Sequence, residues 1–247
     1  VHQGRRLGPQ DLGVLAALGY TAVQVTKKPL IGILSTGNEV VPVSAEPGPG
    51  QVRDANSSLA AGFVQEHGCT PRQYGIVPDD RERLRQAVSK AAGECDAILI
   101  SGGSSKDERD MVASVIGELG EVLAHGIGLQ PGKPTIIGRV ERTPVIGLPG
   151  HPASAYVVLF AIVGELLTAM TGGKRALCTV TARLKENIPS QKGREEYVRV
   201  SVEGGAATPL FGKSGLLNTL VRSNGVVRVP AGSEGFEEGD VVEVILW

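Results

Sequence analysis

Cysteines and aromatic residues are scarce in this chain of 247 residues, and each scarcity excludes a class of protein. The three cysteines, Cys69, Cys95 and Cys178, are odd in number and far apart, which fits neither a disulfide framework nor a zinc knuckle. Phe, Trp and Tyr make up only 4% of the residues, too few for a surface that stacks on single-stranded nucleic acid. The composition therefore indicates a reducing cytoplasm and no nucleic-acid partner.

An excess of charge of either sign and a long apolar run are also missing. The formal net charge is -1, so the sequence lacks the electrostatic footprint of a DNA- or RNA-binding protein. No charged-then-apolar leader opens the chain, and no uninterrupted apolar run is long enough to span a bilayer, so we expect a cytoplasmic protein without membrane contact. The chain begins with Val1 rather than methionine, and we expect further residues upstream.

Apolar runs followed by helix-like segments predict an α/β fold with a doubly wound, mostly parallel sheet. The predicted strands are Leu30–Leu34, Gln73–Val77, Ala97–Ile100, Val122–Ile127, Thr135–Val140 and Pro144–Leu148. The predicted helices are Asn56–His67, Arg81–Ala92, Arg109–Leu119 and Ala153–Met170. Asp54 or Asn56 is the predicted cap of the first of these helices. In such sheets, ligands bind beyond the carboxyl ends of the strands.

The sequence pattern divides the chain into three predicted parts. Residues 1–26, with a helix over Gln10–Leu18 and a strand over Tyr20–Thr26, are interpreted as the remnant of an N-terminal domain. Residues 27–173 form the α/β domain. Residues 174–247 hold short alternating segments between turns, which predict a small all-β domain, either barrel-like or a sandwich. The predicted strands of this domain are Cys178–Leu184, Glu196–Val202, Gly225–Val229 and Asp240–Trp247.

Three loops of the α/β domain have unusual sequences. They are Ser101–Asp107 with Gly102, Gly103 and Ser105, then Pro131–Pro134 with Gly132 and Lys133, and Gly147–Pro152 with Pro149 and Gly150. A glycine-rich turn that leads from a strand into a helix aims backbone N–H groups at a ligand above the sheet edge. Singly, each loop is equally well a tight connection. Together they predict a pocket for an anionic, phosphorylated small molecule.

Two side chains near these loops suit an anion. Lys133 lies between two prolines on a backbone with little freedom, and a stiff loop that presents one ammonium group suits a phosphate clamp. Ser154 lies just inside the helix that follows Pro152, where its hydroxyl either donates to a phosphate or caps the helix. The competing interpretation of Lys133 is a solvated surface lysine.

Carboxylates recur in the turns at the same predicted edge of the sheet. Mg²⁺ binds a few carboxylates together with phosphate oxygens, so these turns are candidate cation sites. Asp79 is interpreted first as a cap, because aspartate in a first helical turn often has that role. Glu39 ends an apolar strand, and Asp110 lies one turn into a helix, so both favour a ligand role. Glu39, Asp80 and Asp110 are the resulting candidates for a catalytic cation site.

The β domain carries arginines and serines in or beside its predicted turns. They are Arg194, Arg199, Ser214, Arg222 and Ser223. Arginines and hydroxyls grouped in this way can hold a tetrahedral oxyanion, although exposed arginines are more often only solvated. His151 has no nucleophile spaced for it, and no His/Cys cluster has metal-ligand spacing.

Five segments follow one another in the order known from one protein family. They are Thr36–Val40, Asp54–Asn56, Ser101–Asp110, Pro131–Pro134 and Gly147–Pro152. They resemble the successive motifs of the molybdopterin molybdenumtransferase family, which includes MoeA and the gephyrin E domain. The opening Leu7–Gly19 and the tail Ser214–Trp247 resemble the same family, so the resemblance covers essentially the whole chain.

The resemblance implies an enzyme of molybdenum cofactor biosynthesis. Members insert molybdate, or tungstate, into adenylylated molybdopterin with release of AMP and use Mg²⁺ or another divalent cation. Cofactor-binding roles are implied for Gly102, Gly103, Ser105, Pro131, Gly132, Lys133, Pro149, Gly150 and Ser154. Glu39, Asp110 and either Asp79 or Asp80 are implied as cation ligands, and Arg194 with Ser214 or Ser223 as the molybdate site. A homodimer is also implied, in which the β domain of one subunit lies near the α/β domain of the other.

Two alternatives remain at this point. One is a non-catalytic pterin-binding or scaffold module, as the gephyrin E domain also serves, which should expose a sizeable apolar patch. The other is the adenylylating enzyme of the same pathway, which shares the α/β fold, but the β domain of residues 174–247 counts against it. Asn38 replaces a usual aspartate, and Gln130 replaces a lysine common before Pro131, so one possible cation ligand and one cationic contact are lost.

Overall fold

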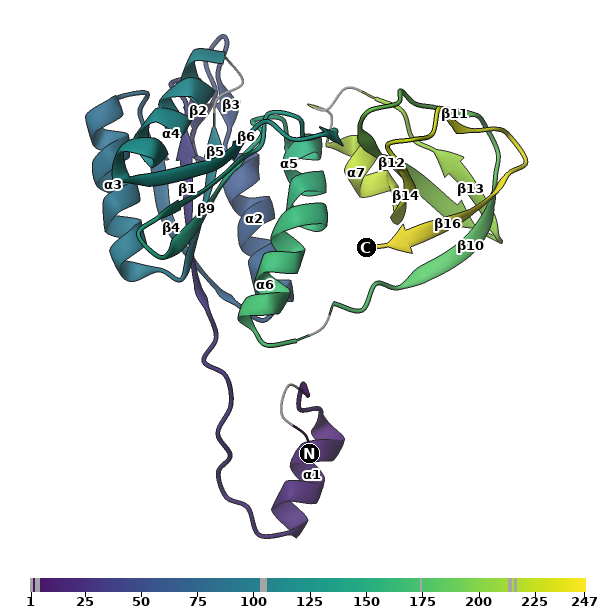
Figure 1. The fold of residues 1–247 in the computed structure, drawn as a ribbon, viewed down its shortest axis with the longest axis horizontal. Helices are drawn as coiled ribbons and strands as arrows, with labels where there is room; N and C mark the ends of the chain where they lie inside the picture. The colour runs from purple at the N-terminus through teal and green to yellow at the C-terminus, as the bar shows by residue number, and fades with distance from the viewer. Residues whose placement is uncertain (1, 3–4, 103–105, 174, 213–214, 216) are drawn as a thin grey trace.

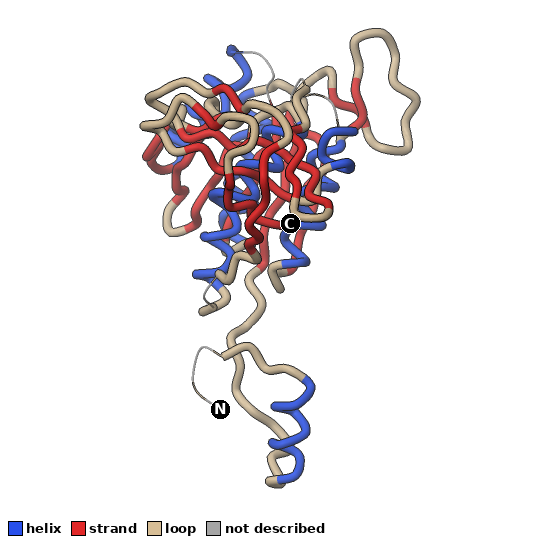
Figure 2. Tube along the Cα trace, turned by 90° about the vertical axis from the view of Figure 1, so that its right-hand side faces the viewer, coloured by secondary structure: helices blue, strands red, loops and turns tan. Residues whose placement is uncertain are grey.

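The computed structural model describes residues 2, 5–102, 106–173, 175–212, 215 and 217–247, without the side chains of residues 106–109. An α/β part and a β-barrel lie side by side, and an N-terminal arm extends away from them (Figure 1). The arm also stands clear of the body in the perpendicular view (Figure 2). The mixed architecture follows the two patterns in the sequence, with strands and helices alternating first and strands dominating later.

A six-stranded sheet in the order β4-β1-β5-β9-β8-β6 forms the centre of the α/β part. Its strands are β1 (Leu30–Thr36), β4 (Thr70–Val77), β5 (Ala97–Gly102), β6 (Gly120–His125), β8 (Ile136–Val140) and β9 (Thr143–Leu148). Strands β4, β1, β5 and β9 run parallel, whereas β8 and β6 are antiparallel to their neighbours. The predicted mostly parallel, doubly wound fold is therefore confirmed, with an antiparallel edge.

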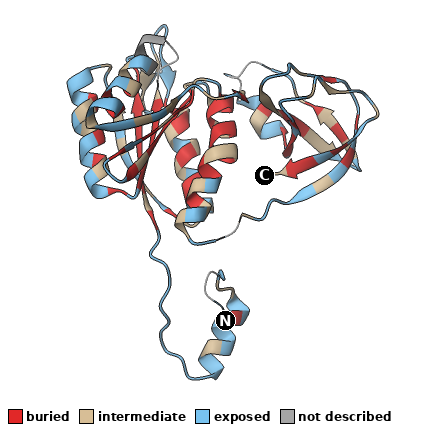
Figure 3. Cartoon of the chain, viewed as in Figure 1, coloured by how far each residue is buried: buried red, intermediate tan, exposed pale blue. Residues whose placement is uncertain are grey.

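Helices cover both faces of this sheet because its central strands are apolar on both faces. Alternate residues of a strand point to opposite faces. Ile33 accordingly packs in one core cluster with α2 (Ala55–Glu66), and Leu34 packs in another with α3 (Arg81–Glu94) and α4 (Lys106–Leu119). Figure 3 shows the buried residues concentrated in the sheet, on the inner sides of the helices and inside the barrel.

The helix after β9 is continuous from Pro152 to Met170 and includes one π-helical turn. It comprises α5 (Pro152–Val158), η1 (Leu159–Val163) and α6 (Gly164–Met170). An 18-residue window of its 19 residues has a mean hydropathy of 1.9, so by length and composition alone it could cross a membrane. In the folded chain, however, this helix packs in the same core cluster as α2 and the sheet. It is the central core helix of the α/β part.

Five strands of the C-terminal part close into a barrel. They are β10 (Thr179–Leu184), β12 (Glu195–Glu203), β13 (Ala206–Pro209), β14 (Gly225–Val229) and β16 (Val241–Leu246). The order is β13-β10-β16-β14-β12, and β12 pairs back onto β13. Of the two forms predicted for this domain, a barrel or a sandwich, the structure has the barrel. The sequence pattern did not predict β13, because this strand has only four residues and directly follows the turn at Gly204–Gly205.

The remaining elements are short. They are β2 (Val40–Val41), β3 (Val52–Arg53), β7 (Leu129–Gln130), β11 (Ile188–Pro189), β15 (Gly235–Phe236) and α7 (Asn218–Arg222). In the arm, α1 (Pro9–Ala17) forms as predicted, and Gly19 follows it with a φ of 82°. The predicted strand Tyr20–Thr26 is wrong, because this segment pairs with none of the strands that the structure describes and Val25 is 70% exposed. A segment with alternating apolar and polar residues forms a strand only when a neighbouring strand pairs with its backbone N–H and C=O groups.

Candidate functional site

A pocket of about 400 Å³ lies between the α/β part and the barrel. Its volume is in the range of small-molecule sites in proteins, about 300–1,000 Å³. The lining residues that the sequence predicted for cofactor binding are Pro131, Gly132, Lys133, Pro149, Gly150 and Ser154. The barrel contributes Glu196, Tyr197, Val198, Arg199, Leu210, Phe211 and Gly212, and the remaining lining residues are Gln130, Pro134 and His151. Two of the three unusual loops thus meet at one rim.

Strand pairing between the two parts of the chain shapes this pocket. β7 of the α/β part pairs in parallel with β12 of the barrel, with Glu195 opposite Leu129 and Glu196 opposite Gln130. Further along the same strand, β12 pairs with β13 from Val200 onwards. Tyr197 and Val198 lie between these two pairings. The pocket therefore occupies the gap that β7 and β13 leave along β12, and the lysine loop begins where β7 ends.

The lysine loop is held in one conformation by contacts that need glycine at position 132. Gly132 has a φ of 137°, and a Cβ there would lie 2.9 Å from Val158 and 3.0 Å from Leu129. Thr135 donates from its hydroxyl to the Gly132 carbonyl at 2.7 Å, and the Ile127 amide donates to the Lys133 carbonyl at 2.9 Å. The loop thus presents the exposed Lys133 side chain on a fixed backbone.

Asn56 ties the carboxyl end of β5 to the turn after β9. Its side-chain amide donates to the Ser101 hydroxyl at 2.8 Å and to the Gly150 carbonyl at 2.9 Å. The capping role left open between Asp54 and Asn56 belongs to Asp54, which accepts from the Ser57 amide at 3.0 Å. Asn56 is therefore a buried clamp that positions the Pro149–Gly150 wall of the pocket.

Ser154 lines the pocket from the first turn of the long helix. Pro152 occupies the first helical position, where a residue without an N–H is favoured. His151, which directly precedes this helix, makes no side-chain cap bond, and a ligand role for the Ser154 hydroxyl stays a prediction. Helix N-terminal amides and a hydroxyl beside them favour a negatively charged ligand.

Arg199 is the most unusual side chain of the pocket. It is only 7% exposed, and within the described part of the chain its guanidinium has neither an ion pair nor a hydrogen bond. Burial lowers the pKa of the Arg199 guanidinium from its ordinary value. An unpaired buried charge is costly for a fold, and an anionic ligand would compensate it. The sequence placed Arg199 near a turn, whereas it lies within β12.

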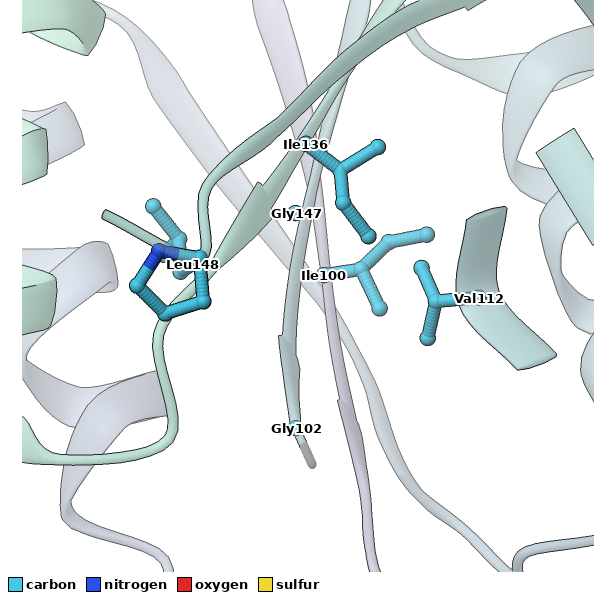
Figure 4. A pocket seen from close by; sticks show the side chains of 7 residues that line it. Ile100, Gly102, Val112, Ile136, Gly147 and Leu148 are labelled. Carbon is cyan, nitrogen blue, oxygen red and sulfur yellow. The ribbon is translucent and has the colours of Figure 1, made fainter. Parts of the chain in front are cut away.

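The glycine loop after β5 is described only in part. Gly102 ends β5, while Gly103 and Ser105 lie outside the described residues. Gly102 also lines a small cavity of about 10 Å³. Figure 4 shows the apolar side chains of Ile100, Val112 and Ile136 that surround it. This cavity has room for about one water molecule and not for a pterin. Pro134 lines both cavities, so the small one lies beside the large pocket.

The candidate cation ligands do not line the pocket, and each has other neighbours among the described residues. The Glu39 carboxylate folds back towards Gly37, and Asp80 caps α3 by accepting from the Arg83 amide at 2.8 Å. Asp110 is 53% exposed, with its carboxylate 3.9 Å from the His125 ring. Asp79 accepts from the Thr36 hydroxyl and the Asn38 amide, as a structural role requires. No three His, Cys, Asp or Glu side chains gather into a metal site within the described ranges.

Two substitutions separate the capping role of Asp80 from a cation-binding role. Asparagine is as good a helix cap as aspartate, so we expect Asp80→Asn to leave the free energy of unfolding nearly unchanged. Asp80→Ala should lower it by about 1 kcal/mol. Urea denaturation followed by circular dichroism measures both values. Equal losses of stability in the two variants would contradict the capping role.

Of the predicted oxyanion residues that the structure describes, neither Arg194 nor Ser223 lines the pocket. Arg194 precedes β12 and does not line the pocket, although its Nε is buried without a partner. The Ser223 hydroxyl donates to the Leu220 carbonyl at 2.9 Å. Ser214 lies outside the described residues. Among the described residues, Arg199 is therefore the arginine that lines the pocket. No periodicity in the sequence predicts that position.

Comparison with known proteins identifies relatives for both parts of the chain. The family described as "Probable molybdopterin binding domain" matches residues 32–169, and the "MoeA C-terminal region (domain IV)" matches residues 181–247. A molybdopterin biosynthesis MoeA protein from Pyrococcus horikoshii superposes with a TM-score of 0.90 at 39% identity, over 100% of this chain and 61% of its own. A molybdenum cofactor biosynthesis protein from Pyrococcus furiosus gives 0.79 at 33% identity, over 100% and 78%.

Curated sequences give the same result. The molybdopterin molybdenumtransferase of Bacillus subtilis is 30% identical over 252 residues, which cover 99% of this chain and 58% of the relative. The chain thus spans about three fifths of the length of the curated relatives it matches.

Proposed function

The chain belongs to the molybdopterin-binding domain family and continues into a MoeA C-terminal region, and on this basis we propose that it binds molybdopterin in the pocket between its two parts. We propose further that it acts in molybdenum cofactor biosynthesis as part of a molybdopterin molybdenumtransferase. The buried guanidinium of Arg199, which has no partner among the described residues, is the observation that carries this proposal, because an anion in that pocket would compensate it.

Two cations and one helix terminus provide the anion-binding end of the proposed site. Arg199 offers a planar fork of N–H donors for an oxyanion, and Lys133 offers an ammonium group on a rigid loop. Ser154 adds a hydroxyl at the start of the long helix. These groups would hold the phosphate of molybdopterin or an incoming molybdate ion. Glu196 also lines the pocket, and its carboxylate accepts a hydrogen bond from the Ser190 hydroxyl at 2.7 Å.

Aromatic side chains of the barrel provide the other wall. Tyr197 and Phe211 line the pocket, and Phe211 is 55% exposed at its rim. A planar pterin ring can stack on an aromatic face, and an exposed ring is free to adopt the required orientation. In the proposed complex the pterin lies against the barrel and its phosphate points to the helix terminus.

The proposed reaction has two parts: water cleaves the phosphoanhydride bond of adenylylated molybdopterin and releases AMP, and the dithiolene sulfurs of the pterin take up molybdate, whose displaced oxygens leave as water. Breaking the phosphoanhydride bond concentrates negative charge on the two separating phosphates. In the proposed site, Lys133 and Arg199 would stabilise that charge, which is the type of interaction that accelerates phosphoryl chemistry. The family implies a divalent cation as well. Since the described carboxylates do not come together, we assign no step to such an ion.

Substituting Lys133 tests the anion-binding end with a modest expected effect. Because Lys133 is exposed, Lys133→Ala should weaken binding of molybdopterin about two- to fivefold, and the loss should shrink as salt is added. Lys185→Ala, which removes an exposed lysine outside the pocket, is the matched control and should have no effect. Titration at low and high ionic strength provides the measurement. A loss that does not depend on salt would contradict this role of Lys133.

The enzymatic proposal is tested by AMP release. The chain, joined to the upstream region that its longer relatives have, should release AMP from adenylylated molybdopterin when molybdate is present. Binding of molybdopterin without any release of AMP would favour the scaffold alternative. One observation supports this alternative: the arm exposes several large apolar side chains, as a surface for a partner would. They are Leu12, Val14, Leu18 and Tyr20.

The homodimer is a separate proposal, in which the barrel of one subunit lies near the α/β part of the other. The barrel that lines the pocket belongs to the same chain as the α/β part, so the described pocket walls need no barrel from a partner. We propose a homodimer only from the family resemblance. Sedimentation equilibrium decides between monomer and dimer.

A further inference from the structure

The single tryptophan of the chain lies where the barrel meets the long helix. The Trp247 ring packs edge-on against Tyr156, with 5.0 Å between ring centroids, and against Phe160, with 5.5 Å. Its indole N–H donates to the Ser223 carbonyl at 3.4 Å. The last residue of the barrel is thereby fixed to the helix of the α/β part.

Phe160 is the centre of this contact region. Besides Trp247, its ring meets Tyr197 of β12 with 6.4 Å between centroids. The Arg175 guanidinium, on the segment that joins the two parts, lies 4.6 Å from the centroid of the same ring. Phe160 therefore touches the barrel strand, the C-terminal residue and the connecting segment at once. It lies in the π-helical turn η1, and such turns occur often at functional sites.

These contacts link the two walls of the pocket, although Phe160 does not line it. Ser154 precedes Phe160 by six residues on one continuous helix. Tyr197 lines the pocket itself, and Arg199 follows it on the same face of β12. A tilt of the barrel at Phe160 would consequently change the distance from Arg199 to Ser154 and Lys133.

We propose that Phe160 is a positioning residue. Together with Trp247, Tyr197 and Arg175 it forms an aromatic joint, which fixes the barrel on the α/β part and sets the position of Arg199 in the pocket. The identity of the ligand in this proposal rests on the proposed function, whereas the joint itself does not.

Phe160→Leu tests the joint, with Phe63→Leu as the matched control. Phe63 and Phe160 are 5% and 6% exposed and belong to the same core cluster. In the part of the chain that the structure describes, the Phe63 ring meets the rings of Tyr156 and His67 and no aromatic ring of the barrel. Both variants should lower the melting temperature by similar amounts. Only Phe160→Leu should weaken the affinity for molybdate and for molybdopterin, by about 2- to 30-fold.

A double-mutant cycle shows whether Phe160 acts through Arg199. If it does, Phe160→Leu should cause little further loss of affinity in an Arg199→Met background, while its effect should multiply with that of Lys133→Ala. If Phe160 had only a structural role, the loss of affinity in Phe160→Leu would multiply with the losses in both Arg199→Met and Lys133→Ala. Equal losses of affinity in the Phe63 and Phe160 variants would also overturn the proposal.

Two readouts need no ligand and so separate this inference from the proposed function. Because Trp247 is the only tryptophan, its emission should shift to longer wavelengths in Phe160→Leu and stay unchanged in Phe63→Leu. Small-angle X-ray scattering should show a broader distribution of distances in the Phe160 variant alone. If neither measurement changes, the joint is refuted, even if molybdopterin binds. If both change but molybdopterin does not bind the wild-type chain, the proposed function fails and the joint stands. Should Phe160→Leu not fold, Trp247→Ala replaces it in the scattering and affinity measurements.

Discussion

Replacing Arg199 with methionine should weaken the affinity for molybdate and molybdopterin and, in the same variant, stabilise the ligand-free protein. A hydrogen bond to a charged group contributes about 1.5–3 kcal/mol, so we expect a loss of affinity of about 10- to 150-fold. In the free protein, methionine fills a similar volume without the penalty of a buried charge that lacks a partner. We therefore expect the free energy of unfolding to rise by about 1–3 kcal/mol.

Calorimetry of binding and urea denaturation measure the two effects. Arg228→Met is the matched control, because Arg228 lies on the neighbouring strand β14, is 57% exposed on its side chain and pairs with Glu195. That variant should change neither affinity nor stability by much, since exposed ion pairs contribute little. If Arg199→Met destabilises the free protein, the guanidinium is compensated in a way the described contacts do not include. Unchanged affinity would remove Arg199 from the site.

Gly102→Ala should be the most destabilising single change at the carboxyl edge of the sheet. A Cβ at this position would lie 2.6 Å from the Thr36 carbonyl oxygen and 2.2 Å from the Thr36 methyl group. Since the first of these is backbone of the neighbouring strand β1, the ends of β1 and β5 must separate to accommodate it. We expect a loss of roughly 3 kcal/mol in the free energy of unfolding.

Gly62→Ala is the matched control for this change. Gly62 is exposed within α2, and a Cβ there meets no atom within 4 Å. Alanine favours the helix over glycine, so this variant should gain about 0.5–1 kcal/mol. Chemical denaturation of both variants provides the comparison. If Gly102→Ala lowers the free energy of unfolding by less than 1 kcal/mol, the ends of β1 and β5 separate easily. The close contact between Gly102 and Thr36 would then have no importance for the site.

The fold could be predicted from the sequence where local pattern and tertiary contacts agree. The apolar run at Leu30–Leu34 requires cover on both faces, and β1 is indeed the parallel neighbour of β4 and β5. The alternation at Tyr20–Thr26 satisfies the same kind of rule but finds no partner strand. Pairing is a property of the whole chain, and local pattern cannot supply it.

The candidate site divides in the same way. Lys133 and Gly150 are marked by their loop sequences, and the structure brings them to one pocket. Asp80 is marked equally well, yet it caps a helix, because a helix start and a ligand site favour the same residue types. The sequence indicates Arg199 only as one of five arginines and serines near predicted turns, since its burial arises only when the face of β12 outside the barrel core is covered by the α/β part.

The shared core of the two parts limits how freely evolution or engineering can exchange them. Val226 and Ile245 of the barrel belong to the same apolar cluster as Phe160 and Leu167 of the long helix. A barrel transferred from a distant relative would therefore have an apolar surface that does not fit the long helix of this chain. It would fit only if the facing helix of the relative were transferred too. The natural unit of recombination is the helix together with the barrel, and the boundary between them is not a place to cut.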